Sequence, residues 1–299
     1  MTEKSVEQKP SKTAEFAALH RAIANKEYNN ERLGPDFLAE YFLPSNYRFF
    51  IKFNKVRASV KKKLNEAFPG LHEYMIARTA YFDRVFRDAL NNQIPQIVFL
   101  GAGYDSRAYR YSKLNSATKI MELDIGPTQN RKKQCLKKAH IDIPEQVRLV
   151  PIDFEKGSLI STLEKAGYEN DKETLFIWEG VSYYLNAEAA DKTLEFVSQS
   201  FHNESAIAFD YAISASEENI NQYGVKEFYL SMKEHHQDES LMFAIDEGKT
   251  GLYLEHRGLK IDNHLDNDEI ESEFLVDENG ALIGRITGNF RFVSASPKR

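Results

Sequence analysis

The sequence predicts an α/β protein in which a helical N-terminal region precedes a mostly parallel sheet that closes with an antiparallel strand. Short apolar runs alternate with helical segments between residues 96 and 211, the order typical of parallel strands joined by crossover helices. The first of these runs ends in Gly101-Ala102-Gly103. A glycine-rich turn after the first strand is typical of sheets that bind a nucleotide-like ligand.

The first third of the chain is expected to be helical. Residues 1–12 are polar and aperiodic, which predicts a flexible tail. Residues 13–95 carry apolar side chains at helical spacing and are broken at Gly34-Pro35 and Pro69-Gly70, so they form a predicted N-terminal helical cap. Within this cap, helices are expected from Thr13 and over 37–42, 47–64 and 72–90.

Residues 96–299 form the predicted α/β domain. Its strands are expected at 96–100, 118–124, 147–153, 174–180, 205–211 and 290–295. Polar residues at about 212–250 interrupt the alternation and predict an inserted helical lid. One more helix is expected to end near Gly258, and residues 273–284 predict a hairpin with an Asn279-Gly280 turn.

Composition excludes several classes of protein. The 299 residues suffice for one elaborated domain or two small ones, and the net charge of −6 argues against a general nucleic-acid partner. No apolar run approaches the roughly 18 residues that span a bilayer, and the N-terminus lacks an apolar signal core. We therefore expect a cytoplasmic location and no membrane partner. Cys135 is the single cysteine, which excludes an intrachain disulfide and a cysteine-cluster metal site, and we expect no bound metal.

Candidate ligand-binding residues lie at the ends of the predicted strands, because ligands bind beyond the carboxyl ends of parallel strands. Glycine there lets the backbone turn tightly and approach a ligand. A carboxylate about 20 residues further on can accept hydrogen bonds from both ribose hydroxyls, and an acid beside an aromatic ring can hold an adenine. The residues of these kinds are Gly101, Ala102, Gly103, Asp105, Glu122, Asp124, Asp153, Phe154, Glu179 and Gly180. They predict a site for an adenosine-containing ligand.

The chemistry of these residues favours one such ligand over two others. The dinucleotide fingerprint requires a third glycine, and Ser106 stands in its place. No phosphate-binding loop of the G-x-x-x-x-G-K type is present in the sequence, and the many carboxylates would repel a pyrophosphate. Acids and aromatic rings instead stabilise a cationic sulfonium, which indicates S-adenosylmethionine.

Five ordered segments, at 74–83, 98–110, 121–124, 150–153 and 178–185, resemble the leucine carboxyl methyltransferase family, which includes bacterial O-methyltransferases of polyketide type. The resemblance covers roughly 13–211 and, more weakly, the C-terminal strands. It implies the class I methyltransferase fold, which is Rossmann-like, with a mostly parallel seven-stranded sheet and an antiparallel C-terminal strand. It also implies S-adenosylmethionine as the cofactor.

The resemblance implies roles for individual residues. Arg78 would pair with the methionine carboxylate of the cofactor, and Gly101 and Gly103 would pass beneath its methionine part. Asp124 would hold the ribose with support from Glu122. Glu179 would lie near the amino group and the sulfonium. The adenine would be surrounded by Asp153, Phe154 and Glu155. Tyr183 and Tyr184 are candidates for the acceptor pocket, and core packing accounts for them equally well.

The sequence thus predicts a methyltransferase that acts on an oxygen, carboxylate or hydroxyl, of a small-molecule or peptide acceptor. A carboxylate acceptor needs no general base, whereas a hydroxyl needs one that the sequence does not identify. The alternative is a protein that binds S-adenosylmethionine or S-adenosylhomocysteine without turnover. A nicotinamide oxidoreductase is disfavoured by Ser106. The sequence is silent on the oligomeric state.

Overall fold

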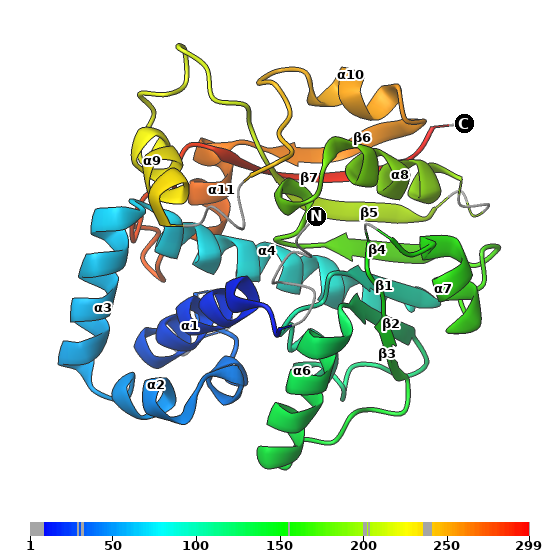
Figure 1. Ribbon diagram of the computed structural model, residues 1–299, viewed down its shortest axis with the longest axis horizontal. Helices are drawn as coiled ribbons and strands as arrows, with labels where there is room; N and C mark the ends of the chain where they lie inside the picture. Colours follow the sequence, from blue (N-terminus) through cyan, green and yellow to red (C-terminus); the bar gives the residue numbers. More distant parts are fainter. Residues whose placement is uncertain are drawn as a thin grey trace.

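The computed structural model describes residues 9–28, 30, 33–154, 156–199, 202, 204–235 and 241–298. Within these residues the sheet has seven strands in the order β3-β2-β1-β4-β5-β7-β6 (Figure 1). The strands are β1 (Gln96–Leu100), β2 (Lys119–Asp124), β3 (Val147–Pro151), β4 (Thr174–Trp178), β5 (Ala206–Ala212), β6 (Leu259–Leu265) and β7 (Phe290–Pro297).

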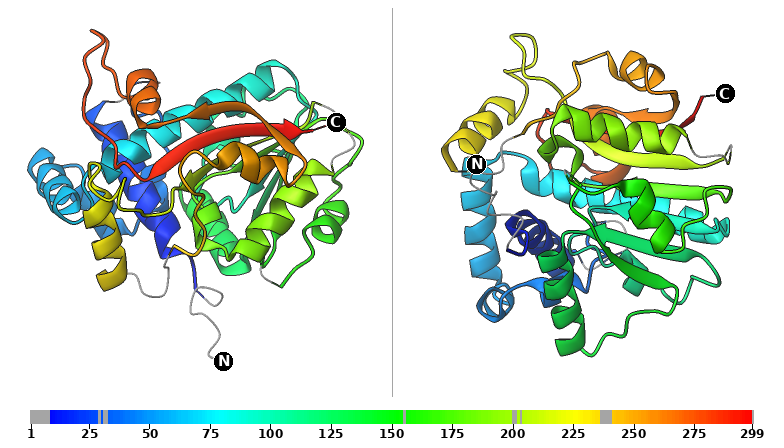
Figure 2. Two further views of the ribbon diagram at one scale, coloured as in Figure 1. Left: turned by 90° about the horizontal axis from the view of Figure 1, so that it is seen from above. Right: turned by 45° about the vertical axis from the view of Figure 1, so that its right-hand side comes forward.

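Strands β1 to β5 are parallel, and β7 runs antiparallel to both of its neighbours, β5 and β6. Figure 2 shows β7, in red, alongside β6. The predicted fold class is therefore confirmed, as are the six predicted strands, each within a few residues. The strand order reverses between β1 and β4, and in open parallel sheets ligands bind beyond the carboxyl ends of the strands at such a reversal.

Helices precede the sheet, connect its strands and cover both of its faces. Those before β1 are α1 (Lys12–Glu27), the 3-10 helix η2 (Ala39–Phe42), α2 (Ser45–Phe50), α3 (Asn54–Ala67) and α4 (Leu71–Asn91). Those that follow are α5 (Arg107–Arg110), α6 (Gly126–Lys138), α7 (Leu159–Lys165), η3 (Ser182–Tyr184), α8 (Ala187–Ser198), α9 (Val225–His235), α10 (Thr250–Glu255) and α11 (Asn267–Phe274).

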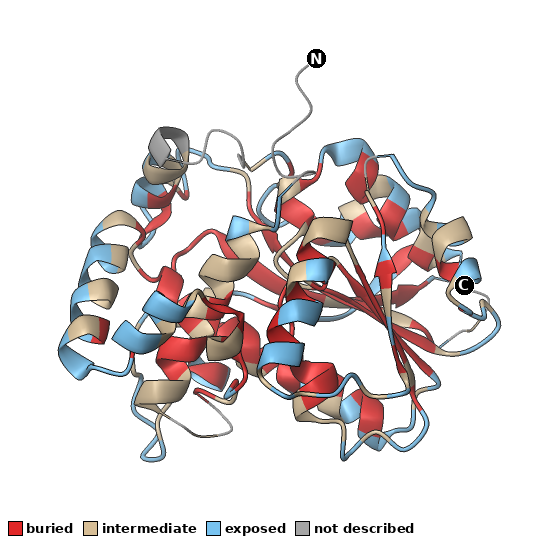
Figure 3. Ribbon diagram, turned by 60° about the horizontal axis from the view of Figure 1, so that its bottom comes forward, coloured by how far each residue is buried: buried red, intermediate tan, exposed pale blue. Residues whose placement is uncertain are grey.

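Because successive side chains of a strand point to opposite faces of the sheet, the strands contribute to two hydrophobic clusters, one on each face. In β1, Ile97 and Phe99 pack with α1, α4, α6 and α11, whereas Val98 and Leu100 pack with α7, α8 and α10. Strands β1, β4, β5 and β7 are almost wholly buried, and Figure 3 shows many exposed residues on the outer sides of the helices. The helices of the cap share the first cluster with the sheet, so the cap packs directly on the sheet.

Local sequence signals position several helices. Asn186 caps α8 by accepting a hydrogen bond from the Ala189 amide at 2.9 Å. Gly70 precedes α4 at a φ of +76°, in the left-handed region that glycine tolerates. Pro127 stands in the first turn of α6, where its missing amide hydrogen costs no helical bond.

Two predictions of local structure are wrong, and one strand is missing from the predictions. The helix expected over 47–64 is divided into α2 and α3 at residues 51–53. The hairpin expected over 273–284 is reduced to one bridge between Val276 and Leu282, because its first residues end α11, which an Asp266–Glu269 capping box starts. Strand β6 was not predicted, because its four central residues are polar or exposed, as an edge strand allows.

The inserted segment at about 212–250 contains α9, which packs against the cap. Phe228 of α9 lies edge-on to Phe68 at 5.7 Å and to Phe290 at 5.3 Å. The function of this segment as a lid and the domain boundaries at 12, 95 and 299 stay predictions. The tail expected at 1–12 lies outside the described residues except for its last four positions.

Candidate active site

The glycine loop after β1 is folded onto the end of β2. Gly101 and Gly103 have φ angles of +84° and +47°. The amides of Gly101 and Ala102 donate to the Leu123 carbonyl at 2.9 and 2.7 Å, and the Gly103 amide donates to Asp124 Oδ2 at 2.6 Å. The structure therefore brings the predicted glycine loop and the predicted ribose-binding acid together.

Asp124 keeps capacity to bind a ligand. Its Oδ2 accepts from the Gly103 amide, and its Oδ1 accepts from the Ile125 amide at 2.7 Å. The Thr128 hydroxyl also donates to this carboxylate, which offers about four lone-pair positions, so about one is left for a hydroxyl donor of a ligand. Burial raises the pKa of Asp124, although the two amide donors counteract this effect.

Glu122, which was predicted to support Asp124 at the ribose, is buried among residues of the protein. Its side chain is fully buried and forms an ion pair with Lys132 Nζ at 2.6 Å, and Tyr109 Oη donates to it at 3.1 Å. Burial raises the pKa of Glu122, and Lys132 counteracts that rise. The contacts of Glu122 explain a structural role, and support of the ribose stays a prediction.

Glu179, at the end of β4, lies between two guanidinium groups. Its Oε1 is 3.1 Å from Arg78 Nε, and its Oε2 accepts from Arg107 Nη1 at 2.6 Å. Arg107 also pairs with Asp105 and, at 2.7 Å, with Asp83. Sequence analysis missed Arg107, although its position in the loop after β1 was a signal.

Asp210, in β5, is a second residue that sequence analysis missed. It is fully buried, and its Oδ1 accepts from the Gly180 amide at 2.6 Å. Its Oδ2 accepts from Tyr74 and lies 3.4 Å from both Arg78 Nη1 and Tyr183 Oη. Asp210 thus joins α4, β4 and β5. An acid near the carboxyl end of the fifth predicted strand was the signal that could have identified it.

Arg78 is held inside this network rather than at its edge. Besides Glu179 and Asp210, its Nη1 donates to Tyr183 Oη at 3.0 Å, and the residue is 4% exposed. Gly180 is required beside it, because a Cβ there would lie 2.9 Å from Arg78 Nη1. To reach a cofactor carboxylate, as the resemblance implies, the guanidinium must exchange or share these contacts.

A second layer of charges connects the glycine loop to the cap. Asp36 accepts from Arg21 Nε at 2.9 Å and from Ser106 Oγ at 2.7 Å, and Arg21 Nη2 donates to the Tyr104 carbonyl at 2.7 Å. Arg110 pairs with Asp83 at 2.6 Å. Burial opposes ionisation of Asp83, but Arg110 and Arg107 outweigh it and lower its pKa to about 2.

The three residues predicted to surround the adenine are less clearly assembled. Asp153 follows β3, lies 3.6 Å from Lys156 Nζ and has a one-third exposed side chain. Phe154 is half-buried against the hydrophobic cluster of α7 and α8. Glu155 lies outside the described residues. Among the acceptor candidates, Tyr183 is buried and Tyr184 half-buried, with ring centroids 4.8 Å apart.

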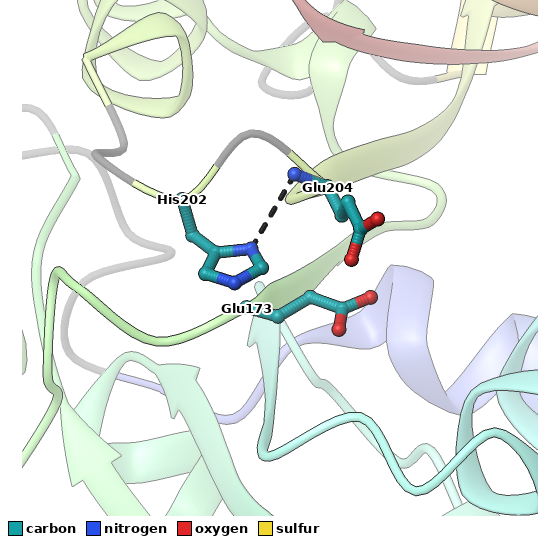
Figure 4. A group of neighbouring side chains, drawn as sticks. All are labelled: Glu173, His202 and Glu204. Atoms are coloured by element: carbon teal, nitrogen blue, oxygen red, sulfur yellow. Dashed lines mark hydrogen bonds between the residues drawn. The ribbon is translucent and has the colours of Figure 1, made fainter.

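One group of possible metal ligands lies away from this site, at the opposite ends of the strands. Glu173 and Glu204 precede β4 and β5, and His202 joins them in a group whose ligand atoms lie within 4.8 Å of one another (Figure 4). The Glu204 amide donates to His202 Nδ1 at 3.4 Å. The absence of a metal stays a prediction.

Comparison with known proteins identifies the class. The family model described as "Leucine carboxyl methyltransferase" matches residues 14–198, a range that contains the glycine loop, Asp124 and Glu179. The chain belongs to the leucine carboxyl methyltransferase family, as the sequence predicted.

Individual relatives agree with this assignment. A Bacillus subtilis protein named "Putative S-adenosyl-L-methionine-dependent methyltransferase YktD" is 31% identical over 204 residues, which cover 67% of this chain and 65% of that protein. A Mycobacterium tuberculosis (strain CDC 1551 / Oshkosh) protein named "Putative S-adenosyl-L-methionine-dependent methyltransferase MT0756" is 30% identical over 190 residues, or 62% of this chain and 58% of that protein. The chain thus spans less than two thirds of the length of these relatives.

Solved structures share the fold over nearly the whole chain. A methyltransferase-like protein from Thermobifida fusca matches with a TM-score of 0.59 at 13% identity, over 98% of this chain and 96% of that one. A DUF574 family protein from Streptomyces avermitilis matches with a TM-score of 0.63 at 11% identity, over 98% of this chain and 99% of that one.

None of the helices in the described ranges is long and apolar enough to cross a bilayer.

Proposed function

We propose that this protein is an S-adenosylmethionine-dependent methyltransferase that transfers a methyl group to an oxygen of a small-molecule acceptor. The observation that carries the proposal is the junction of the glycine loop with Asp124, in which positive-φ glycines and the carboxylate expected to hold a ribose meet at the point where strand order reverses. The names of the relatives support the cofactor.

The charges around the junction favour a cation. The buried ion-pair network contains four guanidinium groups and five carboxylates, which leaves one formal negative charge before Asp124 is counted. Its members are Arg21, Arg78, Arg107, Arg110, Asp36, Asp83, Asp105, Glu179 and Asp210. S-adenosylmethionine carries one net positive charge, whereas a pyrophosphate would add negative charge to this surplus.

The loop also differs from a dinucleotide site in its helix. A pyrophosphate normally lies at the N-terminus of a full helix that follows the glycine loop, where helix amides and the helix dipole bind it. Here the helix after the loop, α5, has only four residues, and Ser106 before it is occupied with Asp36. These features support the methyltransferase assignment over a nicotinamide oxidoreductase.

The residues of the chain supply binding and alignment. When bound, S-adenosylmethionine supplies a methyl group on a positively charged sulfur, which an acceptor oxygen takes by in-line displacement as the carbon–sulfur bond breaks. Asp124 would hold the ribose, and Glu179 and Arg78 would bind the amino and carboxylate groups. Tyr183 and Tyr184 would border the acceptor, beneath the cap and the inserted segment.

The test is methyl transfer from radiolabelled S-adenosylmethionine to a panel of carboxylic acids, phenols and alcohols, with S-adenosylhomocysteine release measured in parallel. Labelled, oxygen-methylated product from any member supports the proposal. Binding of S-adenosylhomocysteine without product across the panel would instead favour a non-catalytic binding protein. Methylation of nitrogen or sulfur compounds alone would contradict the assignment to oxygen.

A further inference from the structure

The cap carries an exposed aromatic surface that its own packing does not use. None of the residues of α2 is buried. Phe49, Phe50 and Phe53 are 54%, 50% and 51% exposed, and Tyr47 of the same helix is 49% exposed. The Phe49 ring lies edge-on to Phe50 at 5.6 Å and to Phe53 at 5.5 Å, so the three phenyl groups form one contiguous surface. We call these four residues the aromatic patch.

The charge around the aromatic patch has the opposite sign to that of the whole molecule. Residues 45–63 contain seven basic residues and no Asp or Glu, although the chain has a net charge of −6. Some of these bases pair with acids elsewhere, as Lys61 does with Glu27 at 2.6 Å. Lys52 and Lys55, which flank Phe53, are exposed and form no ion pair with any described residue.

The aromatic patch lies at the outer edge of the cap, on the side away from the sheet. Figures 1 and 2 agree on the position of α2 there, beyond α1. Phenyl rings that protrude from a peripheral helix amid lysine and arginine side chains have the composition of surfaces that insert into the interface of anionic membranes. A face-to-face dimer through the patch would instead bring two sets of like charges together.

We propose that the aromatic patch docks the protein onto an anionic lipid surface, with the phenyl groups among the acyl chains and Lys52 and Lys55 at the lipid headgroups. The expectation of no membrane partner rested on the lack of a spanning segment, and peripheral docking needs none. The docked segment is continuous with η2, where Phe42 stacks on Tyr104 of the glycine loop at 5.3 Å. Docking would therefore place the cap, and the acceptor side of the site, against the lipid.

Vesicle co-sedimentation of the full chain tests the proposal. Wild-type protein should sediment with vesicles of equal parts phosphatidylglycerol and phosphatidylcholine and stay in solution with phosphatidylcholine alone. A Phe49→Ser/Phe53→Ser variant should bind the anionic vesicles roughly tenfold or more weakly, because it loses two inserted rings. A Lys52→Gln/Lys55→Gln variant should lose a similar factor, and raised salt should weaken wild-type binding.

Leu252→Ser/Leu282→Ser is the matched control, since these two leucines are 58% and 56% exposed on other elements. It should bind the vesicles as wild type does, and circular dichroism should show all variants folded. No binding of folded wild-type protein to anionic vesicles overturns the proposal, as does equal loss in the control. A concentration-dependent dimer in sedimentation velocity that the phenylalanine variant abolishes would assign the patch to self-association and overturn the proposal as well.

Discussion

Gly101 has a backbone conformation that residues with side chains rarely adopt, and its surroundings leave no room for a side chain. Its φ is +84°, and a Cβ there would lie 2.5 Å from Val181 Cγ2. Gly280 has nearly the same φ, +78°, but a Cβ added to it would meet no atom of the described residues within 4 Å. The two glycines therefore separate backbone strain from steric overlap.

We expect Gly101→Ala to lower the free energy of unfolding by about 1–3 kcal/mol more than Gly280→Ala does. Both variants incur the left-handed backbone penalty, and only the first adds overpacking against Val181. Denaturant unfolding of the two variants measures the difference. Equal losses would show that the loop can shift away from Val181.

Asp124 provides the direct test of cofactor binding. Asp124→Ala removes both of its oxygens, and hydrogen bonds to charged groups contribute about 1.5–3 kcal/mol each. Loss of one ribose contact should therefore weaken S-adenosylhomocysteine binding by roughly tenfold or more. Calorimetric titration measures this, with Asp142→Ala, an exposed acid in the loop before β3, as the control. Unchanged affinity in Asp124→Ala would remove Asp124 from the site.

Arg78 is expected to affect the fold as well as the ligand. Arg78→Ala leaves Glu179 and Asp210 without one of their cationic partners, and removal of one partner from a buried pair costs about 3–5 kcal/mol. Arg78→Lys keeps the charge and should be less destabilising. Thermal unfolding without ligand compares the two variants. Wild-type stability in Arg78→Ala would mean that water reaches these carboxylates and replaces the guanidinium.

The sequence predicts single residues well where a local rule applies. Gly101 follows from its turn, and Asp124 from its spacing to that turn. Arg107 and Asp210 are marked in the sequence only by their places near strand ends, because their roles arise mainly from partners 24 to 136 residues away. At Glu122 the local rule misleads. Its position near the end of a strand predicts ligand contact, but in the structure its carboxylate forms an ion pair with Lys132.

At the scale of elements, α1 and α4 are joined by a pair of buried histidines. His20 Nδ1 and His72 Nδ1 are 2.9 Å apart, so one ring must donate and the other must accept. Burial lowers the pKa of His72 to about 4, with a contribution from Lys61. Burial, His72 and Arg78 hold the pKa of His20 well below its usual range. Both rings are therefore neutral at pH 7.

This pair should make stability depend on pH. Below a pH of about 6.5, the ordinary histidine pKa, both histidines bind protons in the unfolded chain but stay neutral in the folded protein. The free energy of unfolding therefore falls as the pH is lowered from 6.5 toward 4. Each histidine contributes up to about 1.4 kcal/mol per pH unit. His72→Gln should reduce the slope of unfolding free energy against pH, and exposed His256→Gln should not. Identical slopes in wild type and His72→Gln would contradict the assignment.

Elements were predictable where periodicity and burial agree. The central strands β1 and β4 are continuous apolar runs after their first residue, because helices cover both faces of the sheet. Strand β6 lies at the sheet edge with a register shift between Ile261 and Asn263, so neither alternation nor an apolar run marks it. At the break between α2 and α3, Arg57 donates to the Ile51 carbonyl at 2.8 Å and to that of Lys52 at 3.2 Å, and no periodicity marks this local arrangement.

At the scale of the whole molecule, the two regions with proposed functions differ in the sign of their charge. A buried network with a negative surplus lies at the carboxyl ends of the strands, and a basic, aromatic segment lies at the outer edge of the cap. The first suits a cationic cofactor, and the second suits an anionic surface. The acceptor would enter between them, so the cap and the inserted segment are where acceptor specificity is expected to reside.

Cofactor binding, the first of these proposed functions, can be tested by one measurement on the intact protein. S-adenosylhomocysteine keeps the adenosine and amino-acid groups of the proposed cofactor, so it should bind the folded state and leave the unfolded chain unaffected. At about 100 times its dissociation constant it should add about 2.7 kcal/mol to the free energy of unfolding, which raises the melting temperature by a few degrees. NAD at the same concentration should give no shift, because Ser106 and the surplus carboxylates oppose a pyrophosphate. A shift with NAD and none with S-adenosylhomocysteine would reverse the assignment of the cofactor. A shift with neither ligand would mean that the contacts of Asp124, Glu179 and Arg78 stabilise the fold alone.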